Sequence, residues 1–331
     1  MMKKVITYGR VREKAQKKLR EHYDLHVFSG QEDVSDASFA DALAEAEALI
    51  GLRIPADDRL LARTPHLKVV SNVSVGYDNL DLEALTRHGV AATNTPDVLN
   101  DTTADAIFGL MLATARRIPE LDRFVKAGEW EREGDLPEEK FGTDVHHRKL
   151  GIIGMGRIGE AIAKRAHFGF DMEILYHNRS PKPEVEETYD ASYCSLEELL
   201  AEADIVCLMT PLTPETRGFI GREQFQQMKQ GAIFINGSRG ATVDEGALIQ
   251  ALETGEILAA GLDVYQQEPV PADHPLLQLT NVVTTPHIGS STGETEDNMS
   301  LLAAENVEAA LEGKRPPNLL NPEVWESGEK G

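Results

Sequence analysis

A glycine-rich turn between an apolar strand and a helix is the first part of this sequence whose spacing indicates chemistry. The turn reads Gly154-Met155-Gly156-Arg157-Ile158-Gly159, after the apolar run 150–153 and before the helical pattern 160–168. The first glycine allows the tight bend, the second lets the backbone approach a pyrophosphate, and the third lets helix and strand pack closely. The helix N-terminus then faces the anion. This strand–turn–helix context favours a dinucleotide site over a glycine turn that binds nothing.

The residues about twenty positions further on indicate which dinucleotide is bound. An enzyme that uses NAD usually has an acidic residue there, which binds the ribose hydroxyls. Here the strand ends in Tyr176-His177-Asn178-Arg179-Ser180, without an acid. Arg179 can pair with a 2′-phosphate, helped by the Ser180 hydroxyl. We therefore expect Asn178, Arg179 and Ser180 to bind NADPH, with NADH as a second cofactor; the alternative is that Arg179 only decorates a surface turn.

Metal-dependent chemistry has little support in the sequence. No HExxH motif and no spaced set of cysteines is present, and His146-His147 is the only histidine pair. Adjacent histidines point in different directions and are more often solvated than metal-bound. We expect no metal site, because hydride transfer needs none when a protein acid can protonate the carbonyl.

The elements that must position these groups follow an alternating pattern. Strands are expected at 5–8, 25–28, 48–52, 67–70 and 90–93, and again at 150–153, 172–176, 204–209, 232–235, 257–262 and 282–284. Helical patterns fall between most of them, and the capping box Ser195-Leu196-Glu197-Glu198 is a clear helix start. Such alternation is typical of α/β folds with parallel sheets, so we expect two doubly wound domains.

Two apolar helices indicate how the domains connect. The segment 100–118 is apolar almost all round after the capping signal Asn100-Asp101-Thr102-Thr103, as expected of a helix buried between two modules. The helical pattern after His287 has no strand of its own to cover. We expect it to pack on the first module, which makes one domain discontinuous. The expected domains are 1–98 with 291–331, and 99–290.

Composition narrows the class of protein. The formal net charge is −22, and no Lys and Arg cluster that could contact phosphates is visible, which opposes nucleic-acid binding. The N-terminus does not resemble a signal peptide, and no window approaches the roughly 18 apolar residues of a membrane span. Two cysteines form no disulfide or ligand pattern. The sequence therefore predicts a cytoplasmic protein with a small-molecule substrate, no nucleic-acid partner and no membrane partner.

Four further blocks resemble a known family. They are Asn236-Gly237-Ser238-Arg239-Gly240, Gly261-Leu262-Asp263-Val264, Glu268-Pro269 and Pro286-His287-Ile288-Gly289-Ser290. With the glycine turn, and in this order, they resemble the D-isomer-specific 2-hydroxyacid dehydrogenases over essentially the whole chain. The resemblance implies a flavodoxin-like substrate domain and a Rossmann cofactor domain, with a cleft between them.

Within that family, two runs are similar to bacterial reductases of glyoxylate, hydroxypyruvate and 2-ketogluconate. They are Asp144-Val145-His146-His147 and the segment 72–79. This similarity implies reduction of a small 2-keto acid to a D-2-hydroxy acid. The three acids share the same reacting end, so the sequence leaves the choice among them open.

By the same resemblance, Arg239, Glu268 and His287 are the catalytic residues. His287 would protonate the substrate carbonyl, and Glu268 would hold the ring and favour its charged form. Arg239 would grip the substrate carboxylate with its planar fork and polarise the keto oxygen. Alone, these residues could be a loop histidine, a surface acid and a helix-capping cation. Together, at the ends of successive strands, they occupy the edge where such sheets bind ligands.

Other site residues have open alternatives. Asp263 would by resemblance hold the nicotinamide amide, or it forms a turn. Thr103 would reach the cofactor phosphates, or it caps its own helix. The N–H groups of Val75 and Gly76 would bind the substrate carboxylate, or they belong to a plain β-turn. Arg53 would contact a longer sugar-acid tail.

Two expectations concern partners. Trp130 is placed similarly to a family residue that packs across the two-fold axis of a dimer, so we expect a homodimer; a buried core aromatic is the alternative. A dinucleotide-binding corepressor or scaffold on the same fold is the alternative function, since related proteins bind partners and keep the same catalytic residues. Substrate-dependent loss of NADPH absorbance separates that alternative from the reductase.

Overall fold

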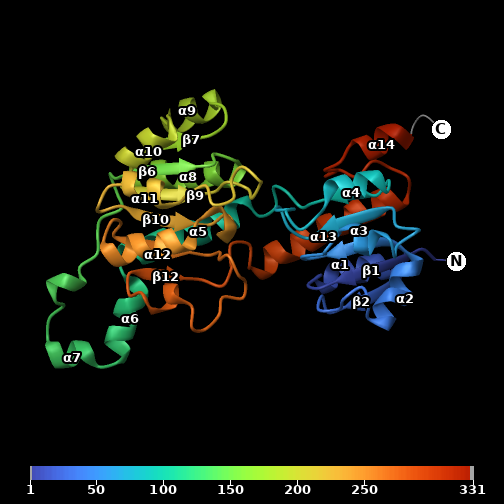
Figure 1. Ribbon diagram of the computed structural model, residues 1–331, viewed down its shortest axis with the longest axis horizontal. Helices are drawn as coiled ribbons and strands as arrows, with labels where there is room; N and C mark the ends of the chain where they lie inside the picture. Colours follow the sequence, from blue (N-terminus) through green and yellow to red (C-terminus); the bar gives the residue numbers. More distant parts are fainter. Residues whose placement is uncertain (1, 329–331) are drawn as a thin grey trace. The chain divides into compact units, whose positions relative to one another are not determined.

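The chain divides into two compact units, each with a sheet of its own. The computed structural model describes residues 2–328. Unit 1 holds the described residues up to Leu99 together with those from Ser291 onward, and unit 2 is Asn100–Ser290. Both ends of the described part of the chain lie in unit 1 (Figure 1).

Unit 1 is built on a five-stranded parallel sheet. Its strands are β1 (Lys4–Tyr8), β2 (Asp24–Phe28), β3 (Ala46–Gly51), β4 (Val69–Asn72) and β5 (Ala91–Thr93). Its helices are α1 (Glu13–Arg20), α2 (Ala37–Glu45), α3 (Asp58–Leu61), α4 (Leu82–Arg87), α13 (Gly293–Leu311) and α14 (Glu323–Gly328). The strand order β2-β1-β3-β4-β5 is that of a flavodoxin-like doubly wound fold, which confirms the predicted class.

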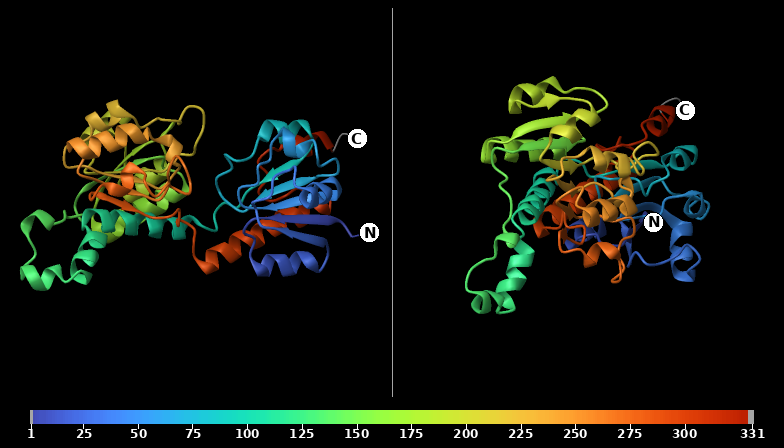
Figure 2. Two further views of the ribbon diagram at one scale, coloured as in Figure 1. Left: turned by 60° about the horizontal axis from the view of Figure 1, so that its bottom comes forward. Right: turned by 60° about the vertical axis from the view of Figure 1, so that its left-hand side comes forward.

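Helices cover both faces of this sheet. On one face α2, α3 and α4 bury Phe39, Leu60 and Leu85 against the strands. On the other face α13 packs against β3, β4 and α1, with Met299 and Val307 buried (Figure 2). Helix α13 therefore covers one face of the unit 1 sheet.

Unit 2 is built on a seven-stranded parallel sheet. Its strands are β6 (Lys149–Ile153), β7 (Glu173–His177), β8 (Ser192–Tyr193), β9 (Ile205–Leu208), β10 (Ile233–Asn236), β11 (Ala259–Leu262) and β12 (Val282–Thr284). Its α-helices are α5 (Asn100–Ala115), α6 (Ile118–Lys126), α7 (Glu129–Glu133), α8 (Arg157–Phe170), α9 (Pro183–Tyr189), α10 (Leu196–Glu202), α11 (Arg222–Gln227) and α12 (Glu245–Thr254). Short 3₁₀ turns cover Glu138–Lys140, Gly240–Thr242 and Pro275–Gln278.

The strand order of unit 2 reverses direction near its centre. The order is β12-β11-β10-β9-β6-β7-β8, so the chain leaves β6 in one direction through β7 and returns on the other side through β9. This is the Rossmann arrangement with an added edge strand, and its ligands bind at the carboxyl ends of the strands where the order reverses. The predicted Rossmann class is therefore confirmed.

Two cores sandwich this sheet because successive side chains of a strand point to opposite faces. Ile205 and Cys207 of β9 join the core under α5 and α8. Val206 and Leu208 join the core under α10, α11 and α12. The strands therefore read as continuous apolar runs, which is typical of parallel sheets covered on both faces.

A helical arm leaves unit 2 between α5 and β6. It comprises α6, α7 and the turn Glu138–Lys140, and Figure 2 shows it projecting away from the unit 2 sheet. Trp130 on this arm is 54% exposed. The alternative that Trp130 is a buried core aromatic is therefore wrong.

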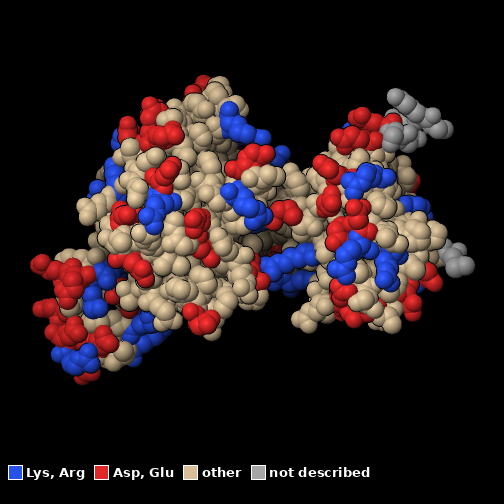
Figure 3. Space-filling model, in the orientation of Figure 1, with Lys and Arg blue, Asp and Glu red and all other residues tan. Residues whose placement is uncertain are grey.

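Three general features complete the fold. None of the described helices is long and apolar enough to cross a membrane. Within residues 2–328, no cluster of His, Cys, Asp and Glu side chains could hold a metal ion, and both cysteines are free. Acidic and basic side chains are interspersed on the face of each unit shown in Figure 3.

Candidate active site

Three neighbouring strands of unit 2 deliver polar side chains to one edge of the sheet. Arg239 follows the end of β10, Asp263 follows β11 directly, and His287 follows β12. The strands pair in parallel, β10 with β11 and β11 with β12, so their carboxyl ends lie at the same edge. This is where an open parallel sheet binds its ligands.

His287 and Glu268 form a hydrogen-bonded pair. His287 Nδ1 lies 2.8 Å from Glu268 Oε2, and the two side chains are 38% and 20% exposed. When the ring is an imidazolium, Nδ1 donates to this carboxylate and Nε2 carries a second proton. The pair therefore offers one proton donor, oriented by a carboxylate, to a ligand at the sheet edge.

The backbone at His287 is unusual. Its φ is +53°, in the left-handed region that side chains other than glycine rarely adopt. Such conformations persist where the surroundings fix them, and they gather at functional sites. The surroundings here are a dense set of hydrogen bonds to the segment 285–289.

Asp263 makes most of those hydrogen bonds. It is 3% exposed, and its Oδ1 accepts from the Thr285 hydroxyl at 2.6 Å and from the Ile288 N–H at 2.8 Å. Its Oδ2 accepts from the Gly289 N–H at 2.9 Å. Asp263 therefore holds the loop that carries His287. The sequence analysis gave two roles for Asp263, binding the nicotinamide amide or forming a turn, and neither of them included this one.

Thr103 lies beside the same loop. It is buried in the first turn of α5, and a Cβ placed on Gly289 would lie 3.2 Å from its Cγ2. Gly289 therefore lets the His287 loop approach α5 closely. The expected contact of Thr103 with cofactor phosphates stays a prediction.

Arg239 is half-buried, and its own loop fixes its backbone. Its carbonyl accepts from Asn236 Nδ2 at 3.2 Å and from the Thr242 hydroxyl at 2.6 Å. Its Nη1 donates to the Ser238 carbonyl at 2.9 Å. The guanidinium is thus positioned by its own loop, and its planar fork has the geometry that a carboxylate matches.

The glycine turn has the form of a dinucleotide cradle. Gly154 has φ +100°, and a Cβ there would lie 2.8 Å from the Met209 carbonyl carbon. A Cβ on Gly159 would lie 2.5 Å from the Gly154 carbonyl oxygen, whereas one on Gly156 would meet no described atom within 4 Å. Helix α8 begins at Arg157, so its first-turn N–H groups face this open side. The turn therefore fits a pyrophosphate over Gly156.

Asn178 holds this turn from the end of β7. Its Oδ1 accepts from the Met155 N–H at 2.8 Å, and its carbonyl accepts from the Tyr193 hydroxyl at 3.2 Å. Its neighbours Arg179 and Ser180 are exposed. The Asn178 side chain is thus engaged within the protein, while Arg179 and Ser180 remain beside the turn as groups that could meet a 2′-phosphate.

Glu215 is an acidic residue near Arg179 that the sequence analysis did not identify. A bond from the Thr213 hydroxyl is the main cause that lowers the pKa of Glu215, and the charge of Arg179 lowers it further. The side chains of Glu215 and Arg179 therefore interact electrostatically. No local sequence signal links them, because they follow different strands.

The remaining predicted residues lie in unit 1. Arg53 follows β3 and has φ +59°, and Val75 and Gly76 follow β4, which pairs with β3. The carbonyl of Val75 accepts from Asn94 Nδ2 at 2.9 Å. The carbonyl of Gly76 accepts from Asn72 Nδ2 at 2.7 Å.

These two asparagines are positioning residues that the sequence analysis missed. Asn72 also bonds Asn79 within the same turn, and Asn94 follows the end of β5. A buried asparagine at a strand end is the signal that could have identified them. They fix a loop whose N–H groups could face an anion at the carboxyl edge of the unit 1 sheet.

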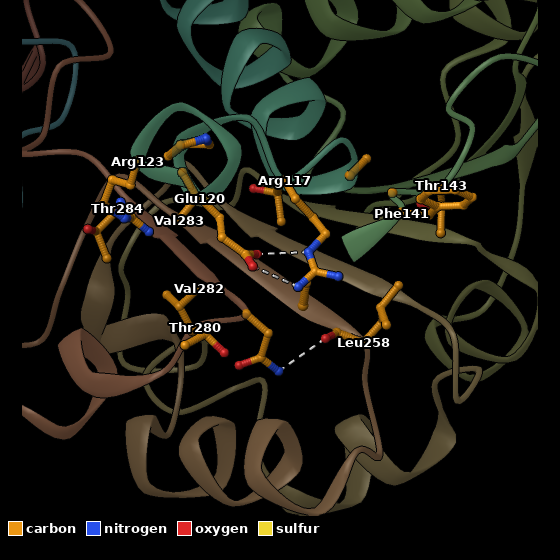
Figure 4. A pocket seen from close by; sticks show the side chains of 16 residues that line it. Arg117, Glu120, Arg123, Phe141, Thr143, Leu258, Thr280, Val282, Val283 and Thr284 are labelled. Carbon is orange, nitrogen blue, oxygen red and sulfur yellow. Dashed lines mark hydrogen bonds and ion pairs between the residues drawn. The ribbon is translucent and has the colours of Figure 1, made fainter. Parts of the chain in front are cut away.

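A separate cavity of about 300 Å³ lies beside the arm in unit 2. It is lined by residues that include Arg117, Glu120 and Phe141 and by the whole of β12, and by none of the predicted site residues (Figure 4). Burial acts to raise the pKa of Glu120, but bonds from Arg117 and Lys140 outweigh it and lower the pKa. Glu120 and Arg117 therefore neutralise each other, and the cavity is distinct from the strand-end site.

Known proteins are similar to this chain over nearly its whole length. Residues 108–289 match the family model described as D-isomer specific 2-hydroxyacid dehydrogenase, NAD binding domain. Glyoxylate/hydroxypyruvate reductase B of Escherichia fergusonii is 49% identical over 324 residues, which covers 98% of this chain and 99% of the relative.

Solved structures agree with that similarity. A protein from Thermus thermophilus is 42% identical with a TM-score of 0.86, covering 96% of this chain and 99% of its own. An NADPH-dependent glyoxylate/hydroxypyruvate reductase from Sinorhizobium meliloti, in complex with NADP and malonate, is 29% identical with a TM-score of 0.87. That match covers 98% of each chain.

Proposed function

Because the chain belongs to the D-isomer-specific 2-hydroxyacid dehydrogenase family, we propose that it is an NADPH-preferring reductase of small 2-keto acids. Its products are D-2-hydroxy acids. The observation that carries this proposal is the His287–Glu268 pair at 2.8 Å, at the same sheet edge as Arg239 and in the same unit as the glycine cradle. A proton donor, an anion grip and a dinucleotide cradle are what a keto-acid reduction requires.

The reaction divides among these groups. The reduced nicotinamide, when bound, supplies a hydride to the keto carbon. Arg239 binds the substrate carboxylate and orients the keto group. His287 donates the Nε2 proton to the keto oxygen as that oxygen gains negative charge, and Glu268 stabilises the imidazolium until then. A proton from water restores the ring after product leaves.

The cofactor preference follows from charge. A carboxylate after β7 would repel a 2′-phosphate, and this chain has Arg179 and Ser180 there instead. The similar reductase from Sinorhizobium meliloti is described as NADPH-dependent and was solved with NADP. Both observations favour NADPH, with NADH as the weaker cofactor.

The two units have separate roles in this proposal. Unit 2 binds the cofactor through the glycine turn, with contributions from Thr103 and Asp263. Unit 1 contributes substrate contacts in addition to Arg239, through Val75 and Gly76, and through Arg53 when the substrate has a sugar-acid tail. The positive φ of Arg53, at the carboxyl end of β3, supports a functional rather than a purely structural position.

An enzyme is favoured over a corepressor or scaffold. Relatives that match the chain over nearly its full length are named as reductases of glyoxylate and hydroxypyruvate. These two acids are therefore the first candidate substrates, and 2-ketogluconate is the third. We place the protein in the cytoplasm, where free cysteines and NADPH are maintained.

A homodimer through the helical arm completes the proposal. Large apolar side chains that are more than a third exposed lie on this arm or directly after it: Ile118, Val125, Trp130, Leu136 and Phe141. Apolar side chains gathered on a projecting element indicate a contact surface, and a second copy is the commonest partner for such a surface.

Steady-state kinetics with glyoxylate, hydroxypyruvate and 2-ketogluconate, each with NADPH and NADH, test the function. We expect NADPH oxidation with at least one acid, and a higher kcat/KM with NADPH than with NADH. Absence of oxidation with all three acids, in protein that binds NADPH, would favour the scaffold instead.

A further inference from the structure

Three loops of unit 2 meet at the backbone and side chain of Tyr265. This residue is 6% exposed and lies between β11 and Glu268. Gly240, directly after Arg239, packs so closely on it that a Cβ at position 240 would overlap the Tyr265 carbonyl group. The Arg239 loop therefore rests on the Tyr265 backbone.

The second loop is held by the Tyr265 N–H. This group donates to Glu268 Oε1 at 3.2 Å, while Glu268 Oε2 pairs with His287. One carboxylate is thus tied at one oxygen to Tyr265 and at the other to the imidazole. Tyr265 thereby limits how far Glu268 can turn away from the ring.

The third loop is held by the Tyr265 hydroxyl. It lies 3.0 Å from the Thr285 carbonyl and 3.2 Å from the Leu262 carbonyl, so its single proton is shared between them. The Thr285 carbonyl also accepts the N–H of His287 at 3.1 Å. The hydroxyl therefore bonds the same oxygen that fixes the unusual backbone of His287.

We propose that Tyr265 is a positioning residue. It keeps the side chains of Arg239, Glu268 and His287 in fixed positions relative to one another, although they lie in three separate loops. This inference rests on the proposed function, because Tyr265 acts through three residues whose catalytic roles belong to that proposal. Asp263 holds the same His287 loop from the other side through Ile288 and Gly289. The His287 loop is thus held at two places, and Tyr265 is the residue that links it to the loops that carry Arg239 and Glu268.

The tyrosine hydroxyl keeps its proton over the working range of pH. Burial first, and then the charge of Asp263, raise the pKa of Tyr265 to about 12. The group therefore remains a hydrogen-bond donor wherever the reductase is active. A phenylalanine at 265 would keep the ring and its packing and would lose only this donor.

The test is Tyr265→Phe, with Tyr189→Phe as the matched control. Tyr189 is 8% exposed in the same unit, and its hydroxyl lies 3.4 Å from Glu160, away from the strand-end loops. We expect Tyr265→Phe to lower kcat about tenfold, because small displacements of reacting groups are costly. We expect the KM for NADPH to change less than about twofold, because the glycine cradle is untouched.

The split between kcat and KM separates positioning from a purely structural role. Tyr265 bonds Glu268 and the loop that carries His287, so its loss should slow the chemical step and leave cofactor binding in place. Tyr189→Phe should leave both kcat and the KM for NADPH in place.

Hydrogen exchange of the segment 285–289 gives a readout that does not need activity. We expect faster exchange in Tyr265→Phe than in the wild type, and no change in Tyr189→Phe. Unchanged kcat, or unchanged exchange, in Tyr265→Phe would overturn the assignment. A wild type without reductase activity would refute the proposed function itself. Hydrogen exchange of the segment 285–289 would then still test, independently of activity, whether Tyr265 holds this loop.

Discussion

Two neighbouring residues at the end of β7, Asn178 and Arg179, have different surroundings and different proposed roles. The Asn178 side chain holds the glycine turn through the Met155 N–H. Arg179 lies next to it, exposed, where its charge is available to a ligand and is felt by Glu215. We therefore expect cofactor choice to depend on position 179 more than on position 178.

Arg179→Ala should weaken NADPH and spare NADH. A guanidinium–phosphate pair is charge-assisted, so its loss should raise the KM for NADPH by about tenfold or more. The KM for NADH should change less than about twofold, since NADH has no 2′-phosphate. Initial rates with both cofactors measure this difference, with Lys182→Ala as a nearby basic control. Equal effects on both cofactors would remove the basis for the NADPH preference.

At the level of elements, the start of β9 depends on one carboxylate. Asp204 Oδ2 accepts from the Lys149 N–H at 2.9 Å, and Oδ1 accepts from Lys229 Nζ at 2.9 Å. Burial acts to raise the pKa of Asp204, but these two bonds outweigh it and keep the pKa below the usual 3.8. The ionised carboxylate therefore stabilises the junction of β6 and β9.

Asp204→Asn should destabilise the fold by about 1–2 kcal/mol at neutral pH, since it replaces a charged acceptor of two hydrogen bonds. The folded-state pKa is lowered, so this stability is present above about pH 4 and is lost as the pH falls below it. Calorimetry at about pH 7 and about pH 3 should therefore show a gap in melting temperature between the wild type and Asp204→Asn, and this gap should narrow on acidification. The exposed Asp122→Asn is the control. A gap of equal size at both pH values would contradict the assigned role of the charge.

Most elements were predictable because their signals are local. Apolar runs, glycine stops and the Ser195 capping box were found where the structure has strands and helices. Strand β8 was missed because two residues give no pattern. Helices α6 and α7 were missed because they lie outside the strand alternation and are separated by Gly128.

The grouping of the candidate site residues was predictable in part for a related reason. Arg239, Glu268 and His287 follow strand ends, and a parallel sheet brings such ends together. The roles of Tyr265, Asn72 and Asn94 depend on partners in other loops. A phenol or amide that acts through a distant carbonyl leaves no periodic trace in the sequence, so only the folded chain reveals it.

At the scale of the whole molecule, the exposed arm predicts how the protein assembles. Val125→Asp combined with Trp130→Asp puts two charges on the arm, which should dissociate the dimer because a buried unpaired charge is costly. Sedimentation velocity should show a monomer for this variant and a dimer for the wild type. Val27→Asp, at a similarly exposed apolar position in unit 1, is the control. A wild type that sediments as a monomer would contradict the proposed dimer.

The most direct measurement of the central claim is the single-turnover rate of glyoxylate or hydroxypyruvate reduction by His287→Ala, loaded with NADPH. General acid catalysis contributes about 10²–10⁴ in rate, so we expect a loss within that range, with NADPH affinity and melting temperature close to those of the wild type. A variant that keeps a rate within about threefold of the wild type would show that His287 is not the proton donor.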